Sequence, residues 1–172
     1  MICKIFINLV RRESRLKMNQ KEFIEVVILN QLGDIVKLHP YLSFPLMATS
    51  IELLGGCIDK SKRGFNAGGG SEKRFNDAIK YLFPLKYHRF TDKSISNIDL
   101  YKGLRCGMNH LFLPNTGVAL TELKSGNSHL SVKNRQLLLV AEELYKDLQE
   151  AGKIVINKLA TGEIQERFVL KI

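Results

Sequence analysis

Cysteine is scarce in this sequence, and its three copies lie far apart. Cys3, Cys57 and Cys106 are an odd number in a chain of 172 residues, a pattern that fits neither a disulfide framework nor a zinc site. Cys57 and Cys106 lie among apolar residues, so we expect buried thiols in a reducing cytoplasm. No apolar run approaches the roughly 20 residues that a membrane span needs. These two absences predict a cytoplasmic protein that does not insert into a membrane.

The sequence also lacks the motifs of several large enzyme classes. It contains no Gly-x-Ser-x-Gly elbow, no His-Glu-x-x-His segment, no dinucleotide fingerprint and no cluster of paired carboxylates. The glycine-rich segment 59–71 departs from the nucleotide-binding P-loop, because no Gly-Lys-Ser or Gly-Lys-Thr closes it. His39, His88 and His129 are scattered without metal-ligand spacing, and we expect surface or capping residues at these positions. The sequence therefore disfavours serine hydrolases, metalloenzymes and oxidoreductases, and we expect no metal and no cofactor.

Acidic residues are outnumbered by basic ones. The chain has 26 Lys and Arg against 17 Asp and Glu, which gives a formal net charge of +9. This excess favours RNA or another polyanion as a partner, although a basic soluble protein without such a partner would have it too. Basic residues concentrate in residues 1–18 and 59–74. We interpret residues 1–18 as a basic N-terminal arm, poorly ordered or added by the choice of start codon, and residues 19–172 as a single helical domain.

Helical periodicity runs through most of the chain, with apolar residues recurring at intervals of three and four. The dipeptide His39-Pro40 and Pro84 end two of the predicted helices, because proline disfavours helical geometry in the residue before it. We expect Ser43 and Ser71 to act as N-caps. The predicted helices cover about residues 20–37, 43–57, 72–83, 94 or 96 to the proline at 114, and 135–159.

A change of pattern separates the last two predicted helices. Residues 118–123 and 129–132 are short β-favouring runs on either side of a turn at 124–127, which predicts a β-hairpin near residues 118–132. The fold class predicted by these patterns is an all-α bundle of about five helices with one small hairpin.

The most informative segment is residues 100–114, in which apolar positions at helical spacing surround Arg105 and His110. Arginine grips phosphate through two parallel hydrogen bonds, and histidine moves protons near neutral pH. On an ideal helix, residues five apart differ by about 140° around the axis. The pair therefore converges only if the helix loosens between them, which Gly107 and Pro114 favour, or if His110 lies at the fraying end of the helix. In the alternative interpretation, Arg105 pairs with a core carboxylate and His110 packs or caps a carbonyl at the helix end.

Glu52 is the only charged residue between Tyr41 and Ile58. A buried carboxylate on so apolar a helix needs a partner, and we expect Arg105, or else His110. Such a contact either orients the Arg105/His110 pair or is a structural ion pair that fixes how the helices pack.

Two further features allow more than one interpretation. Gly103 and Gly107 lie on one helix face, which favours close helix packing within the monomer or a dimer seam. A second feature is a set of basic residues around the glycine-rich loop that could follow an RNA backbone, with Phe65 available for base stacking, or could belong to a mobile solvated loop. These basic residues are Lys60, Lys62, Arg63, Lys73 and Arg74.

An arginine, four intervening residues and a histidine, late in a helix of a small helical domain, resemble the signature of the HEPN superfamily. The order of helices over about residues 20–160 is also similar. Active members of that family are metal-independent ribonucleases that work as dimers, with their two motifs meeting at the subunit interface. The resemblance implies that His110 is a general acid/base toward the ribose 2′-hydroxyl or the leaving oxygen, and that Arg105 holds the phosphate, with Glu52 and Asn109 in support. Nuclease members usually have a polar residue after the arginine, often asparagine, where this chain has Cys106.

The sequence therefore leads to two main hypotheses. The first is a metal-independent endoribonuclease of HEPN type, related to toxin or defence systems and acting as a homodimer. The second is a catalytically inactive HEPN-like module that binds or scaffolds an acidic partner, and a third, narrower possibility is nucleotide binding without hydrolysis.

Overall fold

The computed structural model describes residues 17–59, 69–91, 96–115 and 117–171. The first long helix is continuous and consists of α2 (Gln20–Phe23), the π-helical segment η1 (Ile24–Gln31) and α3 (Leu32–Leu38). Asn19 and Glu22 form a capping box at its start. The predicted helix over residues 20–37 is thus confirmed, with a π segment that its periodicity did not predict.

The second long helix, α4 (Pro40–Ile58), begins three residues earlier than predicted. Pro40 is in its first turn, where the missing N–H costs no hydrogen bond. The prediction of Ser43 as N-cap is wrong, because this residue is already inside the helix and its hydroxyl donates to the Pro40 carbonyl. Pro45 is also inside the helix, and the Thr49 hydroxyl donates to its carbonyl oxygen at 2.9 Å.

Helix α5 (Ser71–Leu82) packs closely on α4, and Gly55 permits this approach. A Cβ at Gly55 would lie 1.7 Å from the carbonyl oxygen of Arg74. Ser71 is not the cap of α5, because Gly70 has that position and the Ser71 hydroxyl donates to Glu52 instead. The short 3-10 helix η2 (Leu85–Phe90) follows.

The segment that carries Arg105 and His110 is part π-helix and part α-helix. The π segment η3 (Tyr101–Cys106) continues directly into α6 (Gly107–Leu111). The helix begins at Leu100, later than predicted, because the Asp99 carboxylate accepts from the Lys102 N–H and caps the first turn.

The predicted hairpin is wrong in its pairing. Strand β2 (Val118–Thr121) exists, but it pairs in parallel with β4 (Gln136–Val140), and β3 (Val132–Lys133) pairs with β4 from the other side. The hairpin therefore joins β3 to β4 through residues 134 and 135, both with positive φ, as in the tight turns that hairpins favour. Residues 123–125 form the 3-10 turn η4 (Leu123–Ser125) instead of a hairpin turn.

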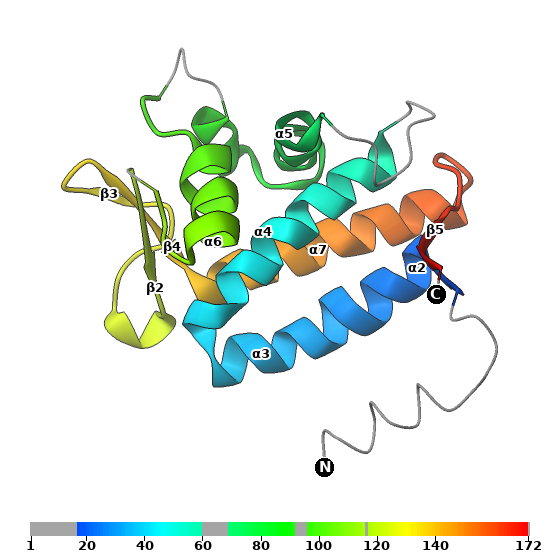
Figure 1. Cartoon of the computed structure of the whole chain (residues 1–172), viewed down its shortest axis with the longest axis horizontal. Coiled ribbons are helices and arrows are strands. Elements are labelled where there is room, and N and C mark those ends of the chain that lie inside the picture. Colours follow the sequence, from blue (N-terminus) through cyan, green and yellow to red (C-terminus); the bar gives the residue numbers. More distant parts are fainter. Residues whose placement is uncertain (1–16, 60–68, 92–95, 116, 172) are drawn as a thin grey trace.

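The last helix, α7 (Ala141–Ala160), begins six residues later than predicted. The apolar run from Leu137 to Val140 fits a buried strand as well as a helix, and Leu137, Leu139 and Val140 are buried in the central strand of the sheet. Helices α4 and α7 cross in the middle of the molecule, with α2, η1 and α3 on one side and α5 and α6 on the other (Figure 1).

Both ends of the described chain meet in a second sheet, in which β1 (Lys17–Asn19) pairs antiparallel with β5 (Phe168–Lys171). Residues 17 and 18 of the predicted N-terminal arm thus belong to a strand, and residues 1–16 lie outside the described part of the chain. The protein is mostly helical with small sheets, which agrees with the predicted class at that coarse level.

Within the described residues, α4 alone is long and apolar enough to cross a membrane by length and composition. More than half of the window that meets this test is buried inside the protein. This burial is typical of the core helix of a soluble protein.

Candidate functional site

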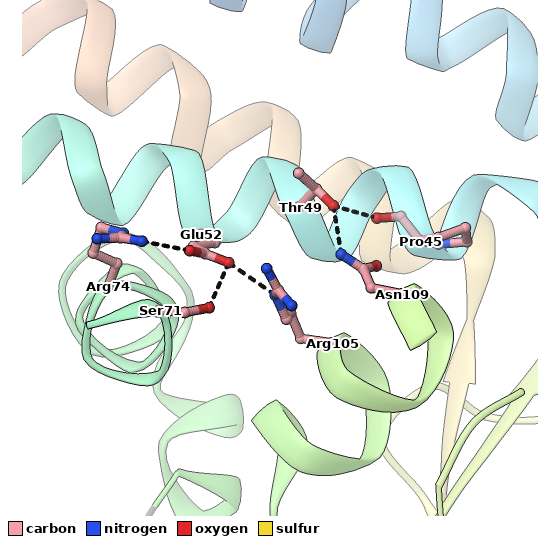
Figure 2. Close-up of polar contacts among 7 residues, drawn as sticks. All are labelled: Pro45, Thr49, Glu52, Ser71, Arg74, Arg105 and Asn109. Atoms are coloured by element: carbon pink, nitrogen blue, oxygen red, sulfur yellow. Dashed lines mark hydrogen bonds and ion pairs between the residues drawn. The ribbon is translucent and has the colours of Figure 1, made fainter. Parts of the chain in front are cut away.

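Three helices meet at the carboxylate of Glu52, on the buried face of α4 (Figure 2). Its Oε1 accepts from Arg74 Nη2 at 2.8 Å, and its Oε2 accepts from Arg105 Nε at 2.8 Å and from the Ser71 hydroxyl at 2.7 Å. Glu52, Ser71, Arg74 and Arg105 are called the Glu52 cluster below. The ion pair expected between Glu52 and Arg105 is present, and Arg74 from α5 is an additional partner.

The Glu52 cluster keeps its carboxylate charged. Burial raises the pKa of Glu52, but hydrogen bonds from Ser71 and Arg74 and the charge of Arg105 outweigh burial, so the pKa lies below its usual value of 4.5. One carboxylate then faces two guanidinium groups. The cluster therefore has one excess positive charge, which favours a bound anion.

Arg105 contacts Glu52 through Nε only, and its side chain is 21% exposed. Among the described residues, its two terminal nitrogens have no hydrogen-bond partner. Figure 2 shows the Arg105 guanidinium joined to Glu52 by a single dashed line. A guanidinium held in this way is oriented by the protein and still has donors for a second anion.

Two more contacts join the Arg105 helix to α4. Asn109 Nδ2 donates to the Thr49 hydroxyl at 3.1 Å (Figure 2), and the Tyr41 hydroxyl donates to the Phe112 carbonyl at 2.9 Å. Because Asn109 is four residues after Arg105, the two side chains lie on the same helix face, toward α4. Asn109 therefore acts here as a packing contact of the helix.

His110 does not share this face. Its side chain is exposed near the end of α6, and among the described residues it has no hydrogen-bond partner. The helix loosening that could bring it to Arg105 occurs in η3, which ends at Cys106, so the interval from Gly107 to His110 is ordinary α-helix. Within one chain, the structure therefore brings Arg105 to Glu52 and leaves His110 on the surface.

Gly103 and Gly107 both allow close contacts within the monomer. A Cβ at Gly103 would lie 2.3 Å from the Val118 side chain, and a Cβ at Gly107 would lie 2.5 Å from the Leu113 carbonyl oxygen. The Gly103 carbonyl also accepts from the Asn115 N–H at 2.9 Å. Of the two interpretations of these glycines, this geometry matches packing within the monomer.

The predicted RNA-binding residues do not form one described surface. Lys60, Lys62 and Arg63 lie outside the described residues. Lys73 is on the surface of α5 and pairs with Asp77, whereas Arg74 belongs to the Glu52 cluster with 14% of its side chain exposed. Lys73 is thus the described member of this set that presents its charge to solvent.

Cys57 is buried, as expected, and burial raises the pKa of its thiol to about 12. Cys106 is only partly buried, next to Arg105. Burial also raises the pKa of Tyr101, and this tyrosine lies near Ser71, Arg105 and Cys106. The residue that departs from the HEPN pattern therefore borders the Glu52 cluster.

A polar network that sequence reasoning missed lies around Tyr87. The Tyr87 hydroxyl donates to Asp147 Oδ2 at 2.8 Å and lies 2.6 Å from His129 Nε2. His129 Nδ1 accepts from the Val140 N–H at 3.0 Å, so the ring proton must be on Nε2 and is donated to Tyr87. Lys86 pairs with the same oxygen of Asp147 at 2.9 Å. We expected a surface or capping residue at His129, and no local sequence signal places it against residues 42 and 18 positions away.

The Tyr87 network fits a structural role. Tyr87 is fully buried, and burial together with Asp147 raises the pKa of its hydroxyl. Burial and the charge of Lys86 lower the pKa of His129 to about 4. Both groups are therefore neutral at pH 7, and the network holds η2, the sheet and α7 together.

No protein-family profile, curated protein or solved structure matches this chain.

Proposed function

We propose that this protein is a metal-independent endoribonuclease of HEPN type in which Arg105 and His110 act on the phosphodiester. The supporting observation is the state of Arg105, a half-buried guanidinium anchored on Glu52 through Nε with its terminal nitrogens unpaired among the described residues. Those nitrogens would hold the phosphate and stabilise the charge that develops on it. His110, exposed near the end of the same helix, would transfer the proton of the 2′-hydroxyl or of the leaving oxygen.

The proposal includes a homodimer with RNA as substrate, in the cytoplasm and in a toxin or defence context. Because Arg105 and His110 face different ways in one chain, a second copy would supply the missing half of each site. The net charge of +9 supports attraction of RNA, and Lys73 would contribute to its binding.

The second candidate is a catalytically inactive module that binds or scaffolds a partner. The observation in its favour is the Glu52 cluster, because ion pairs that join α4 to α5 and η3 would be retained for packing alone. This candidate predicts that the wild-type protein does not cleave RNA.

The experiment is cleavage of an end-labelled RNA pool in excess EDTA by wild type, His110→Ala and His39→Ala. His39 is a matched control, because it is another exposed histidine at a helix end. We expect cleavage by wild type and His39→Ala and its loss in His110→Ala, by about a hundredfold or more. Cleavage by all three proteins would exclude His110 from the site, and cleavage by none would favour the inactive module.

A further inference from the structure

A cavity of about 490 Å³ lies between the first long helix and α7, and it shares no residue with the Glu52 cluster. Small-molecule sites in proteins commonly have volumes of about 300–1,000 Å³. Tyr145 of α7 lines the cavity, and its hydroxyl donates to the Leu29 carbonyl of η1 at 2.8 Å. Gly33 leaves room for this contact, because a Cβ there would lie 2.7 Å from the hydroxyl oxygen. The two walls of the cavity are therefore tied together by a hydrogen bond.

Unpaired charges of both signs line this cavity. Asp34 and Lys37 are exposed on α3, and neither has an ion-pair or hydrogen-bond partner among the residues that the structure describes. Burial raises the pKa of Tyr145 and the charge of Asp34 adds to this effect, so the Asp34 carboxylate lies near the Tyr145 hydroxyl. Glu142 of α7 accepts from the Leu123 N–H through Oε2 at 2.9 Å, and its Oε1 has no hydrogen-bond partner within the described part of the chain. Two carboxylates and one ammonium group are thus available to a ligand.

A larger cavity, of about 660 Å³, lies between α5 and the end of α7, but its charges already have partners. Lys73 pairs with Asp77, and Lys158 pairs with Glu163. Asp59 also acts on Lys73 electrostatically. An ion pair that is already formed must be disrupted before either group can bind a ligand, so the smaller cavity is the stronger candidate.

The positions of the three charges in the smaller cavity match one class of ligand. Asp34 and Lys37 are three residues apart on one helix, which makes their side chains neighbours. An α-amino acid carries an ammonium and a carboxylate on one carbon atom, with the complementary charges. Glu142 lies on the other wall, on α7, where it would face a second cation at the end of the ligand's side chain. The apolar side chains of Leu29 and Val36 line the cavity as well and can contact the methylene groups between these charges.

We propose that this cavity binds a free α-amino acid with a cationic side chain, of the lysine or arginine class. Asp34 holds its α-ammonium group, Lys37 holds its carboxylate, and Glu142 holds the cation at the end of its side chain. Two carboxylates and one ammonium group give the lining a net charge of −1, which complements a ligand with two cations and one carboxylate. The proposal is independent of the ribonuclease function, because it uses neither Arg105 nor His110.

The test is calorimetric titration of the full chain with L-lysine and L-arginine at pH 7, in about 0.15 M salt to screen distant charges. The tighter ligand is then compared with three analogues that each alter one group. For L-lysine these are norleucine without the side-chain cation, cadaverine without the carboxylate, and Nα-acetyl-L-lysine without the α-ammonium group. For L-arginine they are norvaline, agmatine and Nα-acetyl-L-arginine. We expect each analogue to bind at least about tenfold more weakly than the amino acid.

Two variants connect these analogues to the residues. In Lys37→Met, we expect the amino acid to bind no more tightly than the amine without a carboxylate, because the carboxylate has lost its partner. In Glu142→Gln, we expect it to bind no more tightly than the analogue without the side-chain cation. The matched controls are Lys146→Met and Glu150→Gln, which alter exposed charges of α7 outside the cavity and should bind as the wild type does.

Loss of each preference in its matching variant would support the proposal. Three results would overturn it: dissociation constants above about 1 mM for both amino acids, analogues that bind as tightly as the amino acid, or equal effects of the cavity and control variants. Circular dichroism shows that each variant is folded. Because the readout is a change in ligand preference, a variant that is only less stable does not imitate the expected result.

RNA cleavage is not measured in this experiment. Absence of ribonuclease activity therefore leaves the amino-acid result unaffected, and absence of amino-acid binding leaves the proposed ribonuclease function unaffected.

Discussion

At the scale of single residues, Glu52 accepts hydrogen bonds from three side chains on two other helices. We expect Glu52→Ala to lower the free energy of unfolding by about 3 kcal/mol, because it leaves two partly buried guanidinium groups without their carboxylate. Glu52→Gln should cost less, since its amide oxygen still accepts one of these bonds. Urea unfolding at pH 7 measures both effects.

The control for this comparison is Glu150→Ala, which removes a surface ion pair with Lys153 and should change stability by less than about 1 kcal/mol. Equal effects of Glu52→Ala and Glu150→Ala would mean that the Glu52 cluster contributes nothing to packing.

His129 makes the free energy of unfolding depend on pH. Its pKa is lowered from 6.5 to about 4 in the folded protein, so between these values the unfolded chain binds a proton that the folded chain does not. Stability is therefore lost as the pH falls from 6.5 toward 4. The contribution between pH 7 and pH 5 is about 1–2 kcal/mol, after allowance for partial exposure. His129→Gln should be less stable at pH 7 and should lose this part of the pH dependence.

Urea unfolding at pH 7 and pH 5 tests the prediction, with His39→Gln as the control for loss of an exposed histidine. If wild type and His129→Gln lose equal stability over this interval, the neutral His129–Tyr87 contact does not exist as described.

At the scale of elements, the contact between α4 and α5 depends on the absence of a side chain at Gly55. We expect Gly55→Ala to cost about 3 kcal/mol or more, because its Cβ would meet the Arg74 backbone, which cannot move without separating the two helices. Gly152→Ala is the control, since its Cβ would meet only the side chains of Ile24 and Leu29 at 3.1 and 3.3 Å. Its change in stability should stay below about 1 kcal/mol, because alanine favours the helix. Thermal unfolding measures the loss of stability in both variants. A similar loss in Gly55→Ala and Gly152→Ala would show that α4 and α5 can move apart without cost.

The spacing of apolar residues and the positions of prolines predicted most of the helices, but they did not predict the pairing of the sheet. The helices over residues 20–37 and 72–83 follow from apolar spacing and from prolines after them, which are local signals. The strand Gln136–Val140 was missed because its apolar run fits either structure, and residues 134 and 135 lack the glycine that marks tight turns. Pairing of β2 with β4 is non-local, and no pattern within either strand encodes it.

The part of the candidate site that could be predicted is the part whose residues stand out in the sequence as lone charges on apolar helices. A lone Glu52 on an apolar helix pointed to Arg105, because a buried carboxylate demands a cation. Arg74 and Ser71 were missed as partners, since one seemed a surface cation and the other a helix cap. Both contact Glu52 because α5 packs closely on α4 at Gly55. This packing is a tertiary contact, and no local sequence pattern predicts it.

At the scale of the whole molecule, Arg167 connects the end of the chain to the centre. Its Nη2 donates to the carbonyls of Gly56 and Cys57 at 2.6 and 3.2 Å, in the last turn of α4. We expect Arg167→Ala to lose about 1–2 kcal/mol of stability and to expose the buried Cys57 thiol. Reaction of this thiol with a disulfide reagent should accelerate, while Lys146→Ala, an exposed control on α7, should react as the wild type does. Unchanged thiol kinetics would mean that the chain end does not cover α4.

The pairing of β1 with β5 also sets an order of events during synthesis. The N–H of Arg167 donates to the side-chain oxygen of Gln20, and the N–H of Gln20 donates to the Arg167 carbonyl, so each needs a residue almost 150 positions away. At ordinary translation rates, the start of the first helix waits on the order of ten seconds or more before its partner leaves the ribosome. Until then Gln20 has water where it will later have backbone, and the start of the first helix is stabilised only by its local capping box of Asn19 and Glu22.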